Sequence, residues 1–329
     1  MSLLGFLLAL VGGIVPMAFY ALVIYWLDRF EREPLPLAFA VFAWGFIPAA
    51  ILSLISQLIL GFPFALVDNS GVLADTVGAV LLAPFTEEIF KGMAVWIVFL
   101  IWRRQFDGLV DGMVYGAIVG FGFAAVENIL YFIAFGNELI FARAFLFGFN
   151  HALWSALTGM GFGFARHAAR PLLRIAAPLG GLSLAIALHA LHNFLVTFSQ
   201  AFVPLCFVAI FNHWLGVIGL LVIFIVAVRA ERRWISDQLQ DEVGSTLPQE
   251  HYDVVQSPMR RFTTLISAFA GGGFASWTQT GRYFKVLTRL AFNKHAYERR
   301  GEQGARPSEI ESLRDAARDL SEGLSGVVA

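Results

Sequence analysis

The sequence predicts an all-α protein, a polytopic bundle of about seven transmembrane helices followed by a C-terminal cytosolic tail. Hydrophobic residues make up 58% and charged residues only 14% of the 329 residues, a balance that excludes an ordinary soluble domain. Apolar runs of roughly 20 residues, the length that crosses a bilayer as a helix, recur along the chain. The net charge of −1 argues against a nucleic-acid partner and leaves the lipid bilayer as the expected surroundings.

The charges between the apolar runs predict how the helices are oriented. Arginines follow the first, third, fifth and seventh runs, whereas the other connections hold no lysine or arginine apart from Arg143. Because basic loops stay cytoplasmic, the N-terminus is expected outside and the tail inside. The expected domains are a transmembrane domain, residues 1–228, and a cytosolic tail, residues 229–329. The expected spans are residues 3–27, 37–60, 76–101, 109–135, 140–164, 172–198 and 203–228.

Outside the spans the sequence predicts little chemistry. Residues 28–36 are expected to form a solvated cytoplasmic turn. In the tail, residues 262–277 are apolar but short for a span and contain three consecutive glycines, so we expect an interfacial or loosely packed segment. Ser308 and Glu311 have the spacing of a capping box, which predicts one short amphipathic helix ending at Gly323. The apolar stripe of that helix consists of Ile310, Leu313, Ala317 and Leu320.

The third span carries three charged residues, Glu87, Glu88 and Lys91, in an otherwise apolar run. A carboxylate near the middle of a bilayer costs about 2.5 kcal/mol or more on insertion scales. Lys91 lies three and four residues after the two glutamates, so it can neutralise either of them on a helix. A buried ion pair that holds helices together would explain one carboxylate and leave the other unexplained. We therefore favour a functional role for this acidic pair.

The fourth span combines small residues with one deep acid. Glycines at 112, 116, 120 and 122 predict a smooth face that another helix can approach closely. Phe123, Glu127 and Tyr131 recur every fourth residue and share a face. Glu127 is the functional candidate, whereas Asp111, near the cytoplasmic end, is expected to be structural.

Histidines in the fifth and sixth spans complete the set. His151 lies inside the fifth span, and His189, His192 and Asn193 are spaced to line one arc of the sixth. A helix rises 1.5 Å per residue, so depth can be counted from the outer end of each span. By that count, about 12–18 Å separates the outer surface from the carboxylates of the third and fourth spans and from the imidazoles of His151 and His189. His192 is somewhat shallower, and His213 in the seventh span is expected to be structural.

Carboxylates and imidazoles at one depth are the groups needed to activate a water molecule. A zinc ion (Zn2+) held by histidine and glutamate, with one open position, is one possibility. A glutamate oriented by histidine, acting directly as the base, is the other. Asn193 or the Lys91 ammonium can stabilise an oxyanion in either case. Both interpretations predict hydrolysis, and a peptide bond in or beside another protein's transmembrane segment is the natural substrate for a site inside the bilayer.

Three motifs and one further histidine carry a resemblance to a known family. Glu87-Glu-Ile-Phe-Lys91 is similar to an EExxK motif, Phe123-Ala-Ala-Val-Glu127 to FxxxE, and His189-Ala-Leu-His-Asn193 to HxxxN, with His151 as a further intramembrane histidine. Together they resemble the PrsW family of bacterial intramembrane proteases, which is distantly similar to the CAAX-prenyl endopeptidases and bacteriocin-processing membrane enzymes. The similarity covers residues 1–228 and not the tail.

The resemblance implies proteolysis of a membrane-tethered protein, such as an anti-sigma factor, by a multi-pass protein of the bacterial inner membrane. It implies that Glu87 and Glu88 supply catalytic carboxylates and that Asn193 stabilises charge. The implied metal or water site consists of Glu88, Glu127, His151, His189 and His192. An HExxH zinc motif is absent, so zinc itself is inferred from these residue types.

Two other classes of function compete with proteolysis. Buried glutamates and histidines also relay protons in proton- or ion-coupled transporters, although the sequence shows no obvious internal repeat of the kind common in that class. In a non-enzymatic scaffold, the same residues would only lock helices together. Hydrolysis of a peptide would support the protease, and proton-dependent uptake without hydrolysis would support the transporter. Unfolding on a single glutamate or histidine substitution would support the scaffold.

Overall fold

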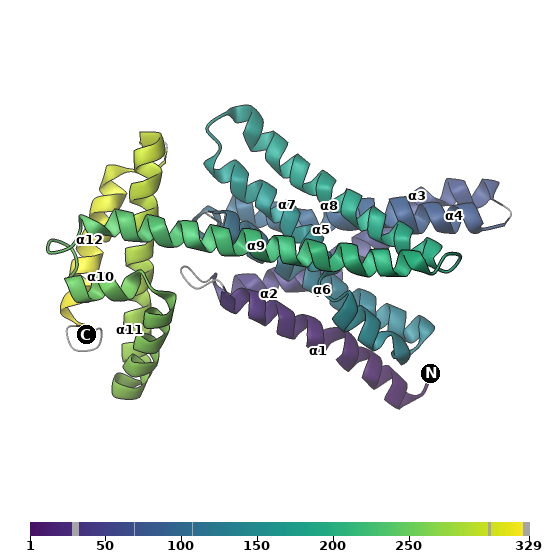
Figure 1. Ribbon diagram of the computed structural model, residues 1–329, viewed down its shortest axis with the longest axis horizontal. Coiled ribbons are helices and arrows are strands. Elements are labelled where there is room, and N and C mark those ends of the chain that lie inside the picture. Colours follow the sequence, from purple (N-terminus) through teal and green to yellow (C-terminus); the bar gives the residue numbers. More distant parts are fainter. Residues whose placement is uncertain (28–32, 69, 107, 302–303, 325–329) are drawn as a thin grey trace. The chain divides into compact units, whose positions relative to one another are not determined.

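The computed structural model describes residues 1–27, 33–68, 70–106, 108–301 and 304–324 (Figure 1). Within these residues the chain is helical, with no β-strand, so the predicted all-α class is confirmed. The described residues form two compact units that divide within one long helix, at Phe224.

The N-terminal unit begins with α1 (Leu3–Leu27) and continues through short and long helices that follow the predicted order. A π-helical segment, Gly45–Ala49, joins α2 (Leu35–Trp44) to α3 (Ala50–Val67). A second, Gly78–Leu82, joins α4 (Val72–Val77) to α5 (Ala83–Ile101). The remaining helices of this unit are α6 (Leu109–Phe135), α7 (Asn150–His167), α8 (Pro171–Ser199) and the first part of α9 (Pro204–Gln240).

Five of the described helical stretches are long and apolar enough to cross a membrane. They are α1, the continuous stretch Leu35–Val67, α6, α8 and α9. The other two predicted spans correspond to α4–α5, which carries Glu87, Glu88 and Lys91, and to the short α7. The protein is therefore a membrane protein built as a helical bundle, while the count of seven spans and their orientation stay predictions.

Two predicted segments differ from the structure. The fifth span is not one helix from residue 140. A π-helical segment, Ala142–Leu146, ends before Phe147, whose φ of −120° and ψ of 11° leave the helical region, and α7 starts at Asn150. The turn at residues 28–36 is not fully solvated either, because Glu33 is buried and its carboxylate accepts a hydrogen bond from the Tyr115 hydroxyl at 2.5 Å. Residues 28–32 of that turn lie outside the described residues.

α6 lies at the centre of the N-terminal unit and contacts α1, α2, α5 and α7. Its glycines explain how closely α7 approaches. A Cβ atom on Gly112, Gly116 or Gly120 would overlap the backbone of Gly159, Ser155 or His151 of α7. The predicted smooth face is thus confirmed for these three glycines, whereas Gly122 points elsewhere and meets the backbone of α2 at Phe42.

The C-terminal unit, residues 225–301 and 304–324, has its own hydrophobic core. Where the sequence predicted one short helix, this unit holds the end of α9, α10 (Gln249–Val255), α11 (Pro258–Arg300) and α12 (Pro307–Glu322). The apolar stripe of α12 is confirmed, since Ile310, Leu313 and Ala317 are buried in the core and Leu320 packs against it.

The predicted capping box of α12 is wrong. The helix already starts at Pro307, with Arg306 as its N-cap, so Ser308 lies inside the first turn. Proline favours the first position of a helix, because its backbone has no amide hydrogen to satisfy there. The predicted end is confirmed, with Gly323 as the C-cap.

Candidate active site

The acidic pair lies in the second turn of α5, at a place that neighbouring elements hold firmly. Thr86 donates a hydrogen bond from its hydroxyl to the carbonyl oxygen of Leu82, 2.8 Å away in the preceding π-helical segment. The indole nitrogen of Trp44 donates to the carbonyl oxygen of Phe90 at 2.9 Å, which ties the end of α2 to α5. Glu87 and Glu88 are both buried between these two anchor points.

Glu88 is surrounded by partners. Its Oε1 atom lies 2.5 Å from Lys91 Nζ and 2.8 Å from His189 Nδ1, and the Ser155 hydroxyl donates to its Oε2 at 3.4 Å. Lys91 and Glu88 are completely buried, so each charge depends on the other for compensation. Glu88 therefore holds the ring of His189 in place and leaves the other ring nitrogen available.

Glu127 likewise holds the ring of His151, but here the second ring nitrogen also has a partner. Its Oε2 atom lies 2.8 Å from His151 Nε2 and 2.5 Å from a guanidinium nitrogen of Arg143. Arg143 also donates from Nε to the Asn128 amide oxygen at 2.9 Å and stacks on the Tyr131 ring at 3.7 Å. The second nitrogen of His151, Nδ1, lies 3.1 Å from Lys91 Nζ. The predicted shared face of α6 thus supplies both the acid, Glu127, and the Tyr131 ring on which its partner Arg143 stacks.

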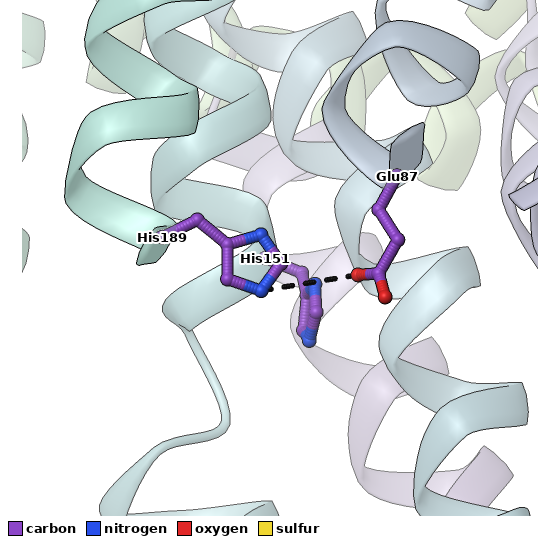
Figure 2. Close-up of side chains that lie close together, drawn as sticks. All are labelled: Glu87, His151 and His189. Carbon is purple, nitrogen blue, oxygen red and sulfur yellow. Dashed lines mark ion pairs between the residues drawn. The ribbon is translucent and has the colours of Figure 1, made fainter. Parts of the chain in front are cut away.

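Glu87 differs from the other two carboxylates because one of its oxygens lacks a hydrogen bond. Gln57 of α3 donates to its Oε1 at 3.3 Å, while its buried Oε2 has no hydrogen-bond partner among the described residues. That oxygen faces His189 Nε2 at 3.8 Å, with the ring of His151 beside them (Figure 2). A carboxylate accepts hydrogen bonds and does not donate them, so the bond to Glu88 assigns the proton of a neutral His189 ring to Nδ1, which leaves the lone pair on Nε2.

Two electron-rich atoms that face each other in a buried site call for a positive or proton-donating species between them. Glu87, His151 and His189 each place one ligand atom within 4.8 Å of the others. Two imidazoles and one carboxylate are a donor set that catalytic zinc sites use, with a further position left open. The unpartnered oxygen of Glu87 and this donor set both fit a divalent cation.

Trp154 supports the same site from α7. Its ring stacks on the His189 ring with centroids 3.8 Å apart and an angle of 14° between the planes. The contact fixes the plane of the imidazole and covers it with an apolar surface.

Two residues predicted for the site have partners elsewhere. The Nε2 atom of His192 lies 3.0 Å from the amide nitrogen of Asn150, and its Nδ1 is buried with no hydrogen-bond partner among the described residues. The Asn193 amide donates to the carbonyl oxygen of Ala79 at 2.8 Å, inside the π-helical segment before α5. His213 is buried as well, next to the Phe147 ring.

Sequence reasoning missed Gln57 and gave no role to Arg143, Trp154 or Ser155. A signal for Arg143 was present, because it is the only basic residue in the connections otherwise free of lysine and arginine. Gln57 was also visible as an amide inside an apolar run, although nothing in the sequence pointed it toward Glu87.

Comparisons with known proteins agree on one family. A family model described as "PrsW family intramembrane metalloprotease" matches residues 33–231. Protease PrsW of Geobacillus kaustophilus is 34% identical over 159 residues, which is 48% of this chain and 67% of that protein. Protease PrsW of Bacillus subtilis is 31% identical over 195 residues, 56% of this chain and 81% of that protein. No solved structure gives a significant match.

Proposed function

This chain belongs to the PrsW family of intramembrane metalloproteases, and from that premise we propose that it hydrolyses a peptide bond in or beside the transmembrane segment of a membrane-tethered protein. The observation that carries the proposal is the open carboxylate oxygen of Glu87, which faces His189 Nε2 at 3.8 Å. We further propose that the protein acts as a multi-pass protein of the cell membrane.

Glu87, His151 and His189 would hold the divalent metal ion, with zinc the best match to the ligand types. A cation bound there supplies Lewis acidity, which activates water at neutral pH and polarises a carbonyl group. The buried position keeps bulk water away, so charges that develop during the reaction are weakly screened.

Glu87 is the carboxylate best placed to act on water. The oxygens of Glu88 and Glu127 already accept from lysine, arginine and histidine groups, whereas Glu87 has one oxygen free to accept a proton. In the alternative without a metal, where this oxygen binds no ion, Glu87 would act as general base: it would take a proton from water as the water oxygen attacks the scissile carbonyl carbon, and then deliver that proton to the departing amine nitrogen.

Glu88 and Glu127 act in this proposal as positioning residues. Carboxylates commonly hold the second nitrogen of a catalytic or metal-binding histidine, which fixes the tautomer and the ring direction. Glu88 does this for His189 and is itself neutralised by Lys91, while Glu127 does it for His151 and is neutralised by Arg143. Lys91 and Asn193 were predicted to stabilise an oxyanion. Their contacts favour a positioning role, because Lys91 pairs with Glu88 and the Asn193 amide donates to the carbonyl oxygen of Ala79.

The test does not require a known substrate. Membranes of a bacterial host that express the wild-type protein, Glu87→Gln or His189→Gln are compared for new protein N-termini within or near transmembrane segments. We expect cleavage products with the wild type and their loss in both variants. Glu138→Gln, which changes an exposed acid elsewhere in the same unit, should cleave like the wild type. Unchanged products with both site variants would contradict the proposal.

Metal analysis separates the two mechanisms. Purified wild-type protein should hold a divalent metal that Glu87→Gln and His189→Gln lose, and a chelator should stop cleavage. If cleavage resists the chelator and no metal is found, the metal part is wrong and Glu87 remains as the unassisted base.

A further inference from the structure

The C-terminal unit contains a helical hairpin. Gly273, at φ 67° and ψ −158°, interrupts α11 and allows the chain to reverse, since only glycine adopts such a conformation readily (Figure 1). The two arms lie side by side. A guanidinium nitrogen of Arg261 donates to the Thr288 hydroxyl at 2.9 Å, and a Cβ atom on Gly281 would lie 3.8 Å from the Leu265 side chain.

The outer part of this hairpin carries no charge. From Phe262 to Gly281 the sequence holds no aspartate, glutamate, lysine, arginine or histidine. Large apolar side chains on both sides of the bend are exposed, with Phe274 at 68% and Phe269 at 56% of their surface. Ile266 and Trp277 are exposed as well, and the rings of Phe274 and Trp277 lie 5.4 Å apart. Clustered exposed aromatics at a tip are unusual for a soluble surface.

Basic residues flank the uncharged hairpin at its base. Arg260 precedes the first arm and Arg282 follows at the base of the second, and both are exposed. Arg261, between Arg260 and the tip, instead faces inward, where its Nε atom donates to the Val255 carbonyl oxygen at 2.5 Å. The first arm from residue 262 to the bend is about 16 Å long at 1.5 Å per residue, roughly half the hydrocarbon thickness of a bilayer.

We propose that this hairpin, residues 262–281, inserts its tip into one leaflet of a membrane that contains anionic lipids, with Arg260 and Arg282 on the lipid phosphates. The apolar, aromatic tip matches the hydrocarbon layer of a bilayer, and the arginines at the other end of the hairpin match the layer of phosphate head groups. The unit follows directly on α9, a helix apolar enough to cross the membrane, so a bilayer is always within reach of it. The hairpin lies outside the residues that match the protease family, and the proposal does not depend on the proposed catalysis.

Site-directed labelling of the full chain tests the proposal. In a Cys206→Ser background, Phe274→Cys carries an environment-sensitive fluorophore, and Asp315→Cys, on an exposed site of α12, provides the matched control. Each protein is placed in nanodiscs of phosphatidylcholine with and without phosphatidylglycerol. Quenching by a spin-labelled phospholipid and by aqueous iodide is then measured.

We expect the label at position 274 to be quenched several-fold more by the spin-labelled lipid than the label at 315, and to be shielded from iodide. The difference should increase with phosphatidylglycerol and decrease in an Arg260→Glu, Arg282→Glu variant. A label at 274 as open to iodide as the control would overturn the proposal. Shielding from iodide without lipid quenching would overturn it too, because the tip would then be covered by protein, such as a second copy of this chain.

Discussion

Lys91 Nζ lies 2.5 Å from Glu88 Oε1, and both side chains are completely buried. Removing one partner of such a pair leaves an uncompensated charge inside the protein, whereas removing both leaves none. The pair therefore explains why a lysine accompanies the two glutamates. Lys91 neutralises Glu88, and in the proposed mechanism Glu87 is left for the chemistry.

Replacing either partner alone should be strongly destabilising. We expect Lys91→Met to lower the free energy of unfolding by about 3–5 kcal/mol, because Glu88 loses its counter-charge. The double variant Glu88→Gln, Lys91→Met should lose less than the sum of the two single variants. Thermal unfolding of the four proteins in one detergent measures this coupling, and strictly additive losses would show that the two charges do not depend on each other.

Arg143 should matter for activity as well as for stability. In Arg143→Gln, Glu127 loses its counter-charge, and we expect reduced cleavage together with a smaller loss of stability than in Lys91→Met, because this pair is partly exposed. Arg143→Lys keeps the charge but not the second hydrogen bond to Asn128 or the stacking on Tyr131, so it should fall between wild type and Arg143→Gln. Product formation per amount of folded protein is the measurement. Full activity in Arg143→Gln would remove Arg143 from the site.

One glycine of α6 and one of α8 offer a matched pair of substitutions. Gly116→Ala should destabilise the protein by about 1–3 kcal/mol, because the new methyl group overlaps the Ser155 backbone. Gly180→Ala in α8 meets no atom within 4 Å and should be neutral or stabilising by about 0.5–1 kcal/mol, as alanine favours a helix. Thermal unfolding of both variants checks the difference, and equal effects would contradict the close approach of α6 and α7.

The C-terminal unit should lose stability in acid through Glu242. Burial alone would raise the pKa of Glu242, but hydrogen bonds from Arg314, Lys294 and Thr246 outweigh it and lower the pKa from 4.5 to about 2. Because the folded pKa lies below the unfolded one, this carboxylate stabilises the fold above about pH 4.5, and the contribution is lost as the pH falls toward 2.

Pulse-labelling hydrogen exchange on peptides of α12 across this pH range should therefore show a loss of protection. The loss should become shallower in Glu242→Gln, while the exposed Asp237→Asn should follow the wild type. A wild-type profile that stays flat through this window would contradict the role of Glu242.

The all-α class and the choice of acids and histidines as candidates could be predicted from the sequence, because both depend on local pattern. Charges are so costly in a bilayer that Glu87, Glu88, Glu127 and His151 stand out from their apolar surroundings. The bounds of α1 and α6 also follow from apolar length alone and are confirmed at Leu3–Leu27 and Leu109–Phe135.

Side-chain partners could not be read from the same pattern. Which of two adjacent glutamates Lys91 neutralises depends on the rotation of α5, and the position of Gln57 opposite Glu87 depends on the path of α3. The break before α7 arises at Phe147, in a run that is apolar apart from Arg143 and holds no proline. The helices of the C-terminal unit were missed because their core forms only when α9, α11 and α12 meet.

The π-helical segment Gly78–Leu82 sets how α5 tolerates changes in chain length. Its turn is one residue longer than an α-turn, as the bond from the Ala83 amide to the Gly78 carbonyl oxygen shows, and the Asn193 amide occupies the Ala79 carbonyl oxygen. Deleting one residue there would let an ordinary α-turn form while the helices on either side keep nearly the same facing. Inserting one residue between this segment and Glu87, where no wide turn takes it up, would rotate everything before it by about 100° relative to Glu87. Single-residue insertions there should thus be far more harmful than single-residue deletions within the π-helical segment.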